Sequence, residues 1–299
     1  SKLFLNDLER RVNAQALDHL RGLGVKVPIA STNTWGGNPL SSLPALTVGD
    51  MVDVHAYAGQ GQLEKNPLTT ANLAHWMGAG QVLGKPLTVS EWNAEPFPTP
   101  DRHSLPLFVA GTASHQGWDA LLQYAYTQEA ATGPGTASNW HAHSDPALLA
   151  TLPAAALMYR QGHVREATTT FVFDPGAELL FNQALSPANA AALRTAMAVG
   201  KLQIAMPTSP ALPWLVRASV APGATVLRDP LASVLPPGAT EASTDTGEIT
   251  HNWSKGTYLI NTPRTQAAMG WLGGETIALQ DVTIKTSTRS ATVAVQSLD

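Results

Sequence analysis

The residue of this chain best placed to do chemistry is Glu91. It follows a short apolar run at residues 86–90 and directly precedes Trp92. A carboxylate is costly to bury without a partner, so one at the end of a buried strand usually has a task such as nucleophilic or acid–base catalysis. The structural alternative is a carboxylate that only caps a helix or faces solvent in a loop.

Two residues of the preceding apolar run, His55 and Tyr57, bear on this choice. They occupy alternate positions within residues 51–57, and side chains two apart in a strand share a face. Tyr57 could donate a hydrogen bond to a carboxylate nucleophile, and His55 could contact a sugar hydroxyl. Taken singly, each is also compatible with an ordinary core position.

Polar and aromatic residues gather where the apolar runs end and in the loop that follows the last of them. The candidate substrate-binding residues of this kind are Asn33, Trp35, Trp92, Tyr124, Tyr126 and Trp140. Aromatic rings suit the apolar faces of pyranose rings, although an aromatic residue in a strand is more often part of a core. The set therefore indicates a carbohydrate ligand only in combination with the carboxylate.

The elements that must position these residues alternate between strand and helix. Strands are predicted at residues 25–31, 51–57, 86–92 and 118–126, and helices at 4–23, 70–82, 105–116 and 144–160, the last after a loop at 131–144. This alternation indicates a parallel sheet, which binds ligands at the carboxyl ends of its strands. Four strands are half of the eight that close a (β/α)8 barrel.

The character of the chain changes after about residue 164. Glycine and proline become frequent, and runs rich in threonine and valine appear with one helical stretch at 187–201. The β-rich runs are predicted at 167–173, 258–261, 276–285 and 290–295. We therefore expect a half (β/α)8 barrel over residues 1–164 and a β-sandwich-like accessory domain over residues 165–299.

The order of these pieces resembles strands five to eight of the clan A retaining glycoside hydrolases. The resemblance covers roughly residues 4–165 and rests on the segments at 31–36, 53–57, 89–93 and 116–126. It implies that Glu91 is the nucleophile of a retaining β-glycosidase and that Tyr57 positions it. It also implies a β-linked oligo- or polysaccharide as substrate and no cofactor, and the remainder is similar to the accessory domain that often follows such barrels.

One part of that pattern is missing, because the family's acid/base glutamate ends strand four and this chain starts beyond that point. That glutamate normally lies in an Asn-Glu or Asn-Glu-Pro motif, which Asn93–Ala94–Glu95–Pro96 superficially imitates in the strand-seven loop, so Glu95 is a possible acid/base residue. A retaining mechanism needs two carboxyl groups about 5 Å apart. Four parallel strand–helix units leave both sheet edges and one apolar face uncovered, so we expect the chain to form a homo-oligomer or to pair with an N-terminal half-barrel.

Composition excludes several other classes of function. The net charge is −4 with scattered basic residues, which argues against nucleic acid, and no apolar run is long enough to cross a membrane. There is no cysteine, no phosphate-binding glycine loop and no Gly-x-Ser-x-Gly. His141 and His143 lack a third metal ligand. A secreted or cell-surface location is favoured, although residues 1–7 do not form a signal peptide.

Two alternatives stay open. The first is a carbohydrate-binding or scaffold protein that keeps Trp35, Trp92 and Tyr124 as a sugar platform but lacks a proton donor. The second is a promiscuous hydrolase of activated esters that works through a surviving carboxylate or through a histidine, His55 or His143.

Overall fold

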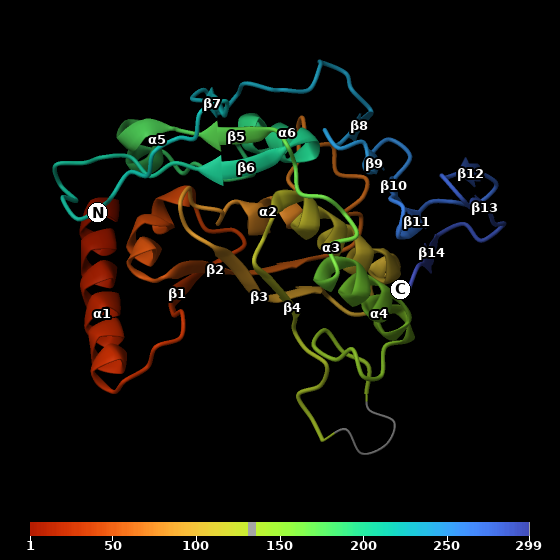
Figure 1. The fold of residues 1–299 in the computed structure, drawn as a ribbon, viewed down its shortest axis with the longest axis horizontal. Helices are drawn as coiled ribbons and strands as arrows, with labels where there is room; N and C mark the ends of the chain where they lie inside the picture. The colour runs from red at the N-terminus through yellow and green to blue at the C-terminus, as the bar shows by residue number, and fades with distance from the viewer. Residues whose placement is uncertain (131–135, 299) are drawn as a thin grey trace.

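Four parallel strands form the sheet that carries the candidate residues (Figure 1). They pair in the order β1–β2–β3–β4, with bounds Ala30–Trp35, Met51–Ala58, Leu87–Ala94 and Ala120–Gln123. The computed structural model describes residues 1–130 and 136–298, so part of the loop predicted at 131–144 lies outside the described residues. The parallel pairing predicted from the sequence is confirmed.

The first strand begins at Ala30 rather than at Val25. The Arg21 guanidinium binds the carbonyl oxygens of Val25 and Val27 at 2.8 Å each, and Pro28 has no N–H group to offer a neighbouring strand. The mostly apolar residues 25–29 therefore form a connection, and the strand follows them.

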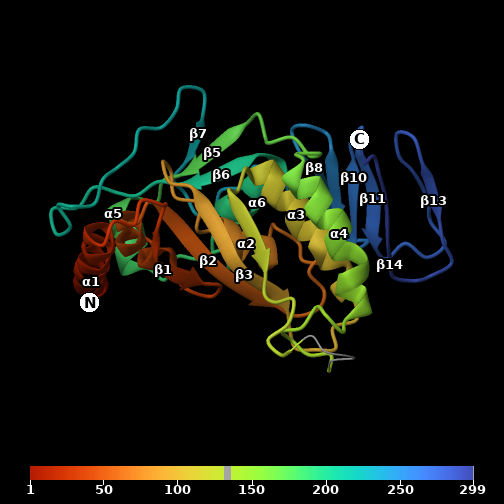
Figure 2. The ribbon, with the colours of Figure 1, turned by 60° about the horizontal axis from the view of Figure 1, so that its bottom comes forward.

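Helices cover one face of this sheet, as Figures 1 and 2 show. They are α2 (Leu73–Gly78), α3 (Leu105–Gln116) and α4 (Pro146–Arg160), while two 3-10 helices, η1 (Leu40–Ser42) and η2 (Pro44–Val48), follow β1. Asp145 caps α4 by accepting from the N–H groups of Ala147 and Leu148. No helix in the described part of the chain crosses the opposite face, which stays open.

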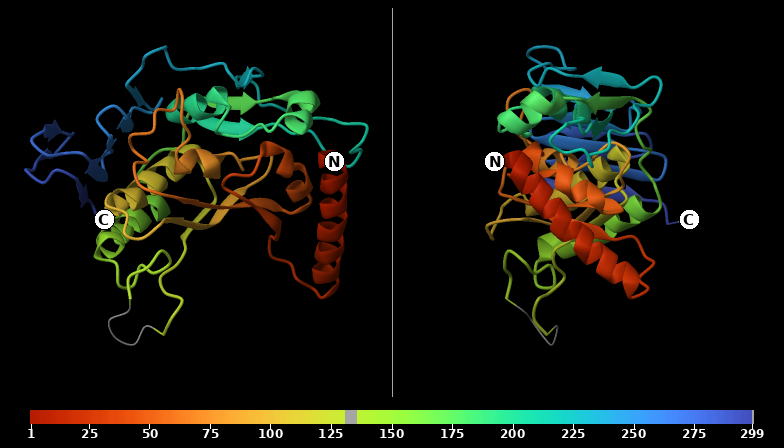
Figure 3. Two further views of the ribbon diagram at one scale, coloured as in Figure 1. Left: turned by 180° about the vertical axis from the view of Figure 1, so that it is seen from behind. Right: turned by 90° about the vertical axis from the view of Figure 1, so that its left-hand side faces the viewer.

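Helix α1 (Lys2–Gly22) stands beside β1 at one end of the molecule, with the antiparallel sheet at the other end (Figure 3). It buries polar residues and exposes apolar ones. The Asn6 amide donates to the Ser41 carbonyl and accepts from the Ala45 N–H, and Asn13 donates to Thr32. Its outer side carries an exposed apolar stripe formed by Leu5, Leu8, Val12 and Leu20.

A second, smaller parallel sheet lies over the helices α2 and α3 (Figure 1). Its strands pair in the order β6–β5–β7, with bounds Lys201–Ile204, Thr170–Phe173 and Thr225–Leu227. The helices α5 (Gly176–Asn182) and α6 (Ala191–Val199) connect β5 to β6. The strand predicted at 167–173 is thus present only over Thr170–Phe173, and it pairs in parallel with both neighbours.

The C-terminal part is an antiparallel sheet with a small hairpin. The sheet order is β14–β11–β10–β9–β8, with bounds Ala291–Gln296, Thr265–Gly270, Thr257–Asn261, Ile249–Asn252 and Glu241–Ser243. Strands β12 (Thr276–Ala278) and β13 (Thr283–Lys285) form the hairpin. The chain is therefore an α/β protein with parallel and antiparallel sheets, and no helix among the described residues is long and apolar enough to span a membrane.

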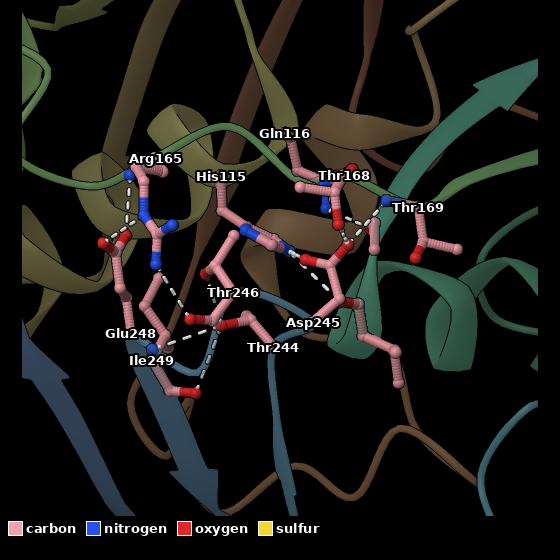
Figure 4. Close-up of polar contacts among 12 residues, drawn as sticks. His115, Gln116, Arg165, Thr168, Thr169, Thr244, Asp245, Thr246, Glu248 and Ile249 are labelled. Atoms are coloured by element: carbon pink, nitrogen blue, oxygen red, sulfur yellow. Dashed lines mark hydrogen bonds and ion pairs between the residues drawn. The ribbon is translucent and has the colours of Figure 1, made fainter.

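The segment that follows α4 is fastened to the antiparallel sheet by two carboxylates (Figure 4). Asp245 accepts from the N–H and hydroxyl of Thr168 and from the N–H of Thr169, and Glu248 binds the backbone and guanidinium of Arg165. His115, at the end of α3, lies 3.7 Å from Asp245. One hydrophobic core runs across residue 164, from Leu40 in η1 to Met269 in β11.

Candidate active site at the carboxyl ends of the parallel strands

A β-bulge in β3 decides which side chains reach the open face of the sheet. Val54 pairs with Val89, but the next residue of β2, His55, pairs with Glu91. Ser90 is the extra residue, so Ser90 and Glu91 both reach the face of His55. Bulges of this kind often re-aim a side chain next to an active site.

Glu91 is held by two neighbours from β2. The Tyr57 hydroxyl donates to Glu91 Oε2 at 2.6 Å, as the sequence predicts, and His55 Nδ1 lies 3.3 Å from the same oxygen without hydrogen-bond geometry. The Glu91 side chain is 27% exposed, so it is held from within the sheet and still accessible from the open face.

The Tyr57 hydroxyl is a fixed donor. Burial raises its pKa above the ordinary value, and the hydrogen bond to Glu91 and the negative charge of Glu91 raise it further. The charge of Glu95 adds a smaller increase in the same direction. Tyr57 therefore keeps its proton and presents it to the Glu91 carboxylate.

A polar layer lies directly beneath this pair. Asp53 accepts from the hydroxyls of Ser90 at 2.7 Å and Thr88 at 2.6 Å. His55 Nε2 lies 2.8 Å from Ser90 Oγ and 3.3 Å from Asn33 Nδ2. The imidazole is thus fixed on the side away from Glu91, and Asn33 contacts His55 from β1.

Sequence reasoning missed Asp53, Thr88 and Ser90 as members of the site. Asp53 stands two residues before His55 and four before Tyr57, so the same alternation that placed the latter two would have included it. Thr88 is placed by the same rule on the next strand, whereas Ser90 and Glu91 share a face only because of the bulge.

Two tryptophan rings pack against the Tyr57 ring. Trp140 meets it edge to face with 5.0 Å between ring centroids, and Trp35 lies 5.9 Å from it and 5.5 Å from His55. Tyr124 extends the row, 6.1 Å from Trp140. Trp35 is 51% exposed and offers a free surface at the edge of the site.

The structure does not bring the other two aromatic candidates to this cluster. Trp92 is 2% exposed and lines a groove of about 210 Å³ on the helix-covered side with Leu121 and Ala155. The bulge explains this, because it places Glu91 on the open face and the next residue on the opposite one. Tyr126 packs against His143 in the loop after β4.

The acidic and histidine candidates outside the strands are placed as follows. Glu95 follows β3, and its N–H donates to the Ala58 carbonyl, which keeps it at the same end of the sheet as Glu91. His141 is buried, and its Nδ1 lies 3.2 Å from the Thr136 carbonyl oxygen. Within residues 1–130 and 136–298, no three histidine, cysteine or acidic side chains are grouped so that they could hold a metal ion.

No family model, curated protein or solved structure matches the chain. What the site does must therefore be argued from its geometry. That geometry is a partly exposed carboxylate, held by a protonated tyrosine, at the carboxyl end of a parallel strand and beside an aromatic surface.

Proposed function

We propose that this chain carries the nucleophile half of a retaining β-glycosidase site, with Glu91 as the nucleophile. The observation that carries the proposal is the 2.6 Å hydrogen bond from Tyr57 to Glu91 on an open, aromatic-lined face of the sheet. A nucleophilic carboxylate must be oriented and reachable, and these contacts meet both needs.

In the proposed reaction, a Glu91 carboxylate oxygen attacks the anomeric carbon and the bond to the leaving oxygen breaks. The leaving oxygen takes a proton from a second carboxyl group, and water activated by that group then hydrolyses the glycosyl ester. Tyr57 orients the carboxylate, and His55 beside it contacts the sugar. Trp35 and Trp140 supply apolar surface for the ring.

The second carboxyl group comes from Glu95 or from another polypeptide unit. Two features support a partner unit. The outer strands β1 and β4 each pair on one side only within the described sheet, and α1 exposes the apolar stripe of Leu5, Leu8, Val12 and Leu20. Parallel strands are rarely left open on one face, so a second copy or an N-terminal half-barrel would complete the site.

The decisive experiment traps the nucleophile without needing the second carboxyl group. A panel of 2,4-dinitrophenyl 2-deoxy-2-fluoro-β-glycosides has a leaving group that departs without a proton, and the fluorine slows hydrolysis of the glycosyl ester. Peptide mass spectrometry should find the adduct on Glu91. The adduct should be absent in Glu91→Gln and present in the neighbouring control Glu95→Gln. An adduct on another residue, or none with any sugar, would refute the proposal.

A second candidate, binding without turnover, is favoured by the exposed Trp35 ring next to Tyr57. Titration calorimetry of β-linked oligosaccharides with Glu91→Gln would detect it. Binding that is lost in Trp35→Ala, together with no adduct in the trapping experiment, would favour this candidate over the enzyme.

A further inference from the structure

A buried arginine outside the carboxylate cluster connects the strand of Glu91 to the loop of Trp140. Arg102 opens the short 3-10 helix η3 (Arg102–Ser104) and is 1% exposed. A guanidinium is costly to bury, and an apolar side chain of similar volume is often at least as stabilising. The contacts of Arg102 therefore call for an explanation other than stability.

The Arg102 contacts join two parts of the site. Its Nη2 donates to Asn93 Oδ1 at 3.1 Å and to the Asn139 carbonyl at 2.9 Å, and its Nη1 donates to the Ser138 carbonyl at 3.1 Å. Asn93 lies two residues beyond Glu91, and Ser138 and Asn139 directly precede Trp140. The planar fork of an arginine is suited to holding several acceptors in a fixed arrangement.

Two further contacts lock the same loop. Asn93 Nδ2 donates to the carbonyls of Asn139 at 2.8 Å and Tyr124 at 2.6 Å. The Asp145 carboxylate lies 3.1 Å from Arg102 Nε and neutralises the buried charge, while it also caps α4. The short segment that contains Trp140 is thereby held both before and after the tryptophan.

We infer that Arg102 is a positioning residue that sets Trp140 edge-on against Tyr57, and through Tyr57 the orientation of Glu91. The route runs from the Arg102 guanidinium to the backbone of residues 138–139, then to the Trp140 ring and the Tyr57 ring at 5.0 Å. The effect on Glu91 matters for catalysis only if the proposed function holds. The placement of Trp140 does not depend on it.

The test uses the full chain labelled with 5-fluorotryptophan, in which fluorine NMR resolves the tryptophans. The variant Trp140→Phe assigns the Trp140 signal. Arg102→Lys removes the fork but keeps the charge, and it should shift and broaden the Trp140 signal. Arg194→Lys is the matched control, because Arg194 is equally buried and donates to four backbone carbonyls around Pro67, Leu68 and residues 187–188.

An unchanged Trp140 signal in Arg102→Lys, or an equal change in Arg194→Lys, would overturn the inference. If Arg102→Lys does not fold, the double variant Arg102→Met with Asp145→Asn replaces it, since it removes the fork without leaving a buried charge unpaired and asparagine keeps the helix cap. An unchanged Trp140 signal in that double variant would be equally fatal. Where the wild type forms the Glu91 adduct, Arg102→Lys should slow its formation roughly 10-fold. A wild type without adduct refutes the proposed function and leaves the fluorine result standing.

Discussion

Glu91 lies directly across from His55 in the β2–β3 pair, one residue further along β3 than the pairing of Val54 with Val89 would give. This displacement brings the Glu91 carboxylate within 3.3 Å of the His55 ring and within 2.6 Å of the Tyr57 hydroxyl.

Replacing Tyr57 by phenylalanine should slow adduct formation at Glu91 without unfolding the protein. A hydrogen bond to a charged group contributes about 1.5–3 kcal/mol, which corresponds to a decrease of roughly 10- to 100-fold. The phenyl ring keeps the packing against Trp140 and Trp35. The trapping rate is measured by mass spectrometry, and an undiminished rate would show that Tyr57 does not orient the carboxylate.

Replacing Ser90 by alanine should lower the free energy of unfolding by about 1–3 kcal/mol, because Asp53 loses a buried donor and His55 loses its 2.8 Å partner. Ser114→Ala is the matched control, since the Ser114 hydroxyl is buried without a hydrogen-bond partner among the described residues. Urea unfolding compares the two variants. A loss as large in Ser114→Ala as in Ser90→Ala would contradict this account.

Lowering the pH should reduce the free energy of unfolding already at pH values above those at which carboxylates titrate. His75 and His251 line a cavity of about 40 Å³, and burial lowers their pKa to about 3 and about 4. The folded state holds both rings neutral, whereas the unfolded state protonates them near pH 6.5. Their contribution to stability is thus complete above that pH and is lost as the pH falls toward the folded values.

The expected slope is about 1.4 kcal/mol per pH unit for each histidine between about pH 6 and pH 5. His251→Gln keeps a donor for the Leu63 carbonyl but does not titrate. The free energy of unfolding, measured with urea across this pH range, should therefore fall less steeply with decreasing pH in the variant. The difference in slope should equal the contribution of one histidine. Equal slopes in the two proteins would show that His251 is not held neutral by the fold.

The exposed apolar stripe of α1 should make the chain associate. Leu8 and Val12 lie one turn apart on its outer side, so Leu8→Glu with Val12→Glu should shift the average mass in light scattering toward the monomer. Val216→Glu is the control, because Val216 is an exposed apolar residue outside that helix. A wild-type chain that is monomeric at all concentrations would count against a partner surface on α1.

The sequence predicted the helices and strands that have strong patterns and short turns. Helix α3 spans the predicted residues 105–116, and strand β2 starts at the predicted Met51. The contact between Tyr57 and Glu91 was also predictable, because the end of one parallel strand lies beside the end of the next. Local periodicity carries this information.

What the sequence could not show depends on tertiary contacts. Regular alternation cannot put Glu91 and Trp92 on one face of the sheet. The bulge determines which of the two side chains lies on the open face, and it is visible only in the pairing of β3 with both neighbours. The spacing of the apolar residues predicts the helix at 4–23 but not the side that it buries: the helix buries Asn6 and Asn13 because Ser41, Ala45 and Thr32 offer them partners. Arg102 carries no local signal, since its acceptors lie up to 37 residues away.

The bulge also has a consequence for insertions and deletions at this point of the gene. Val89 faces the helices. In a variant that lacks Ser90, the glutamate would directly follow Val89, and regular alternation would turn the glutamate side chain to the open face. Such a protein would lose the hydroxyl shared by His55 and Asp53 while keeping the acid in place. A one-residue deletion at position 90 is therefore expected to keep the glutamate on the open face, whereas replacing the glutamate removes the carboxylate.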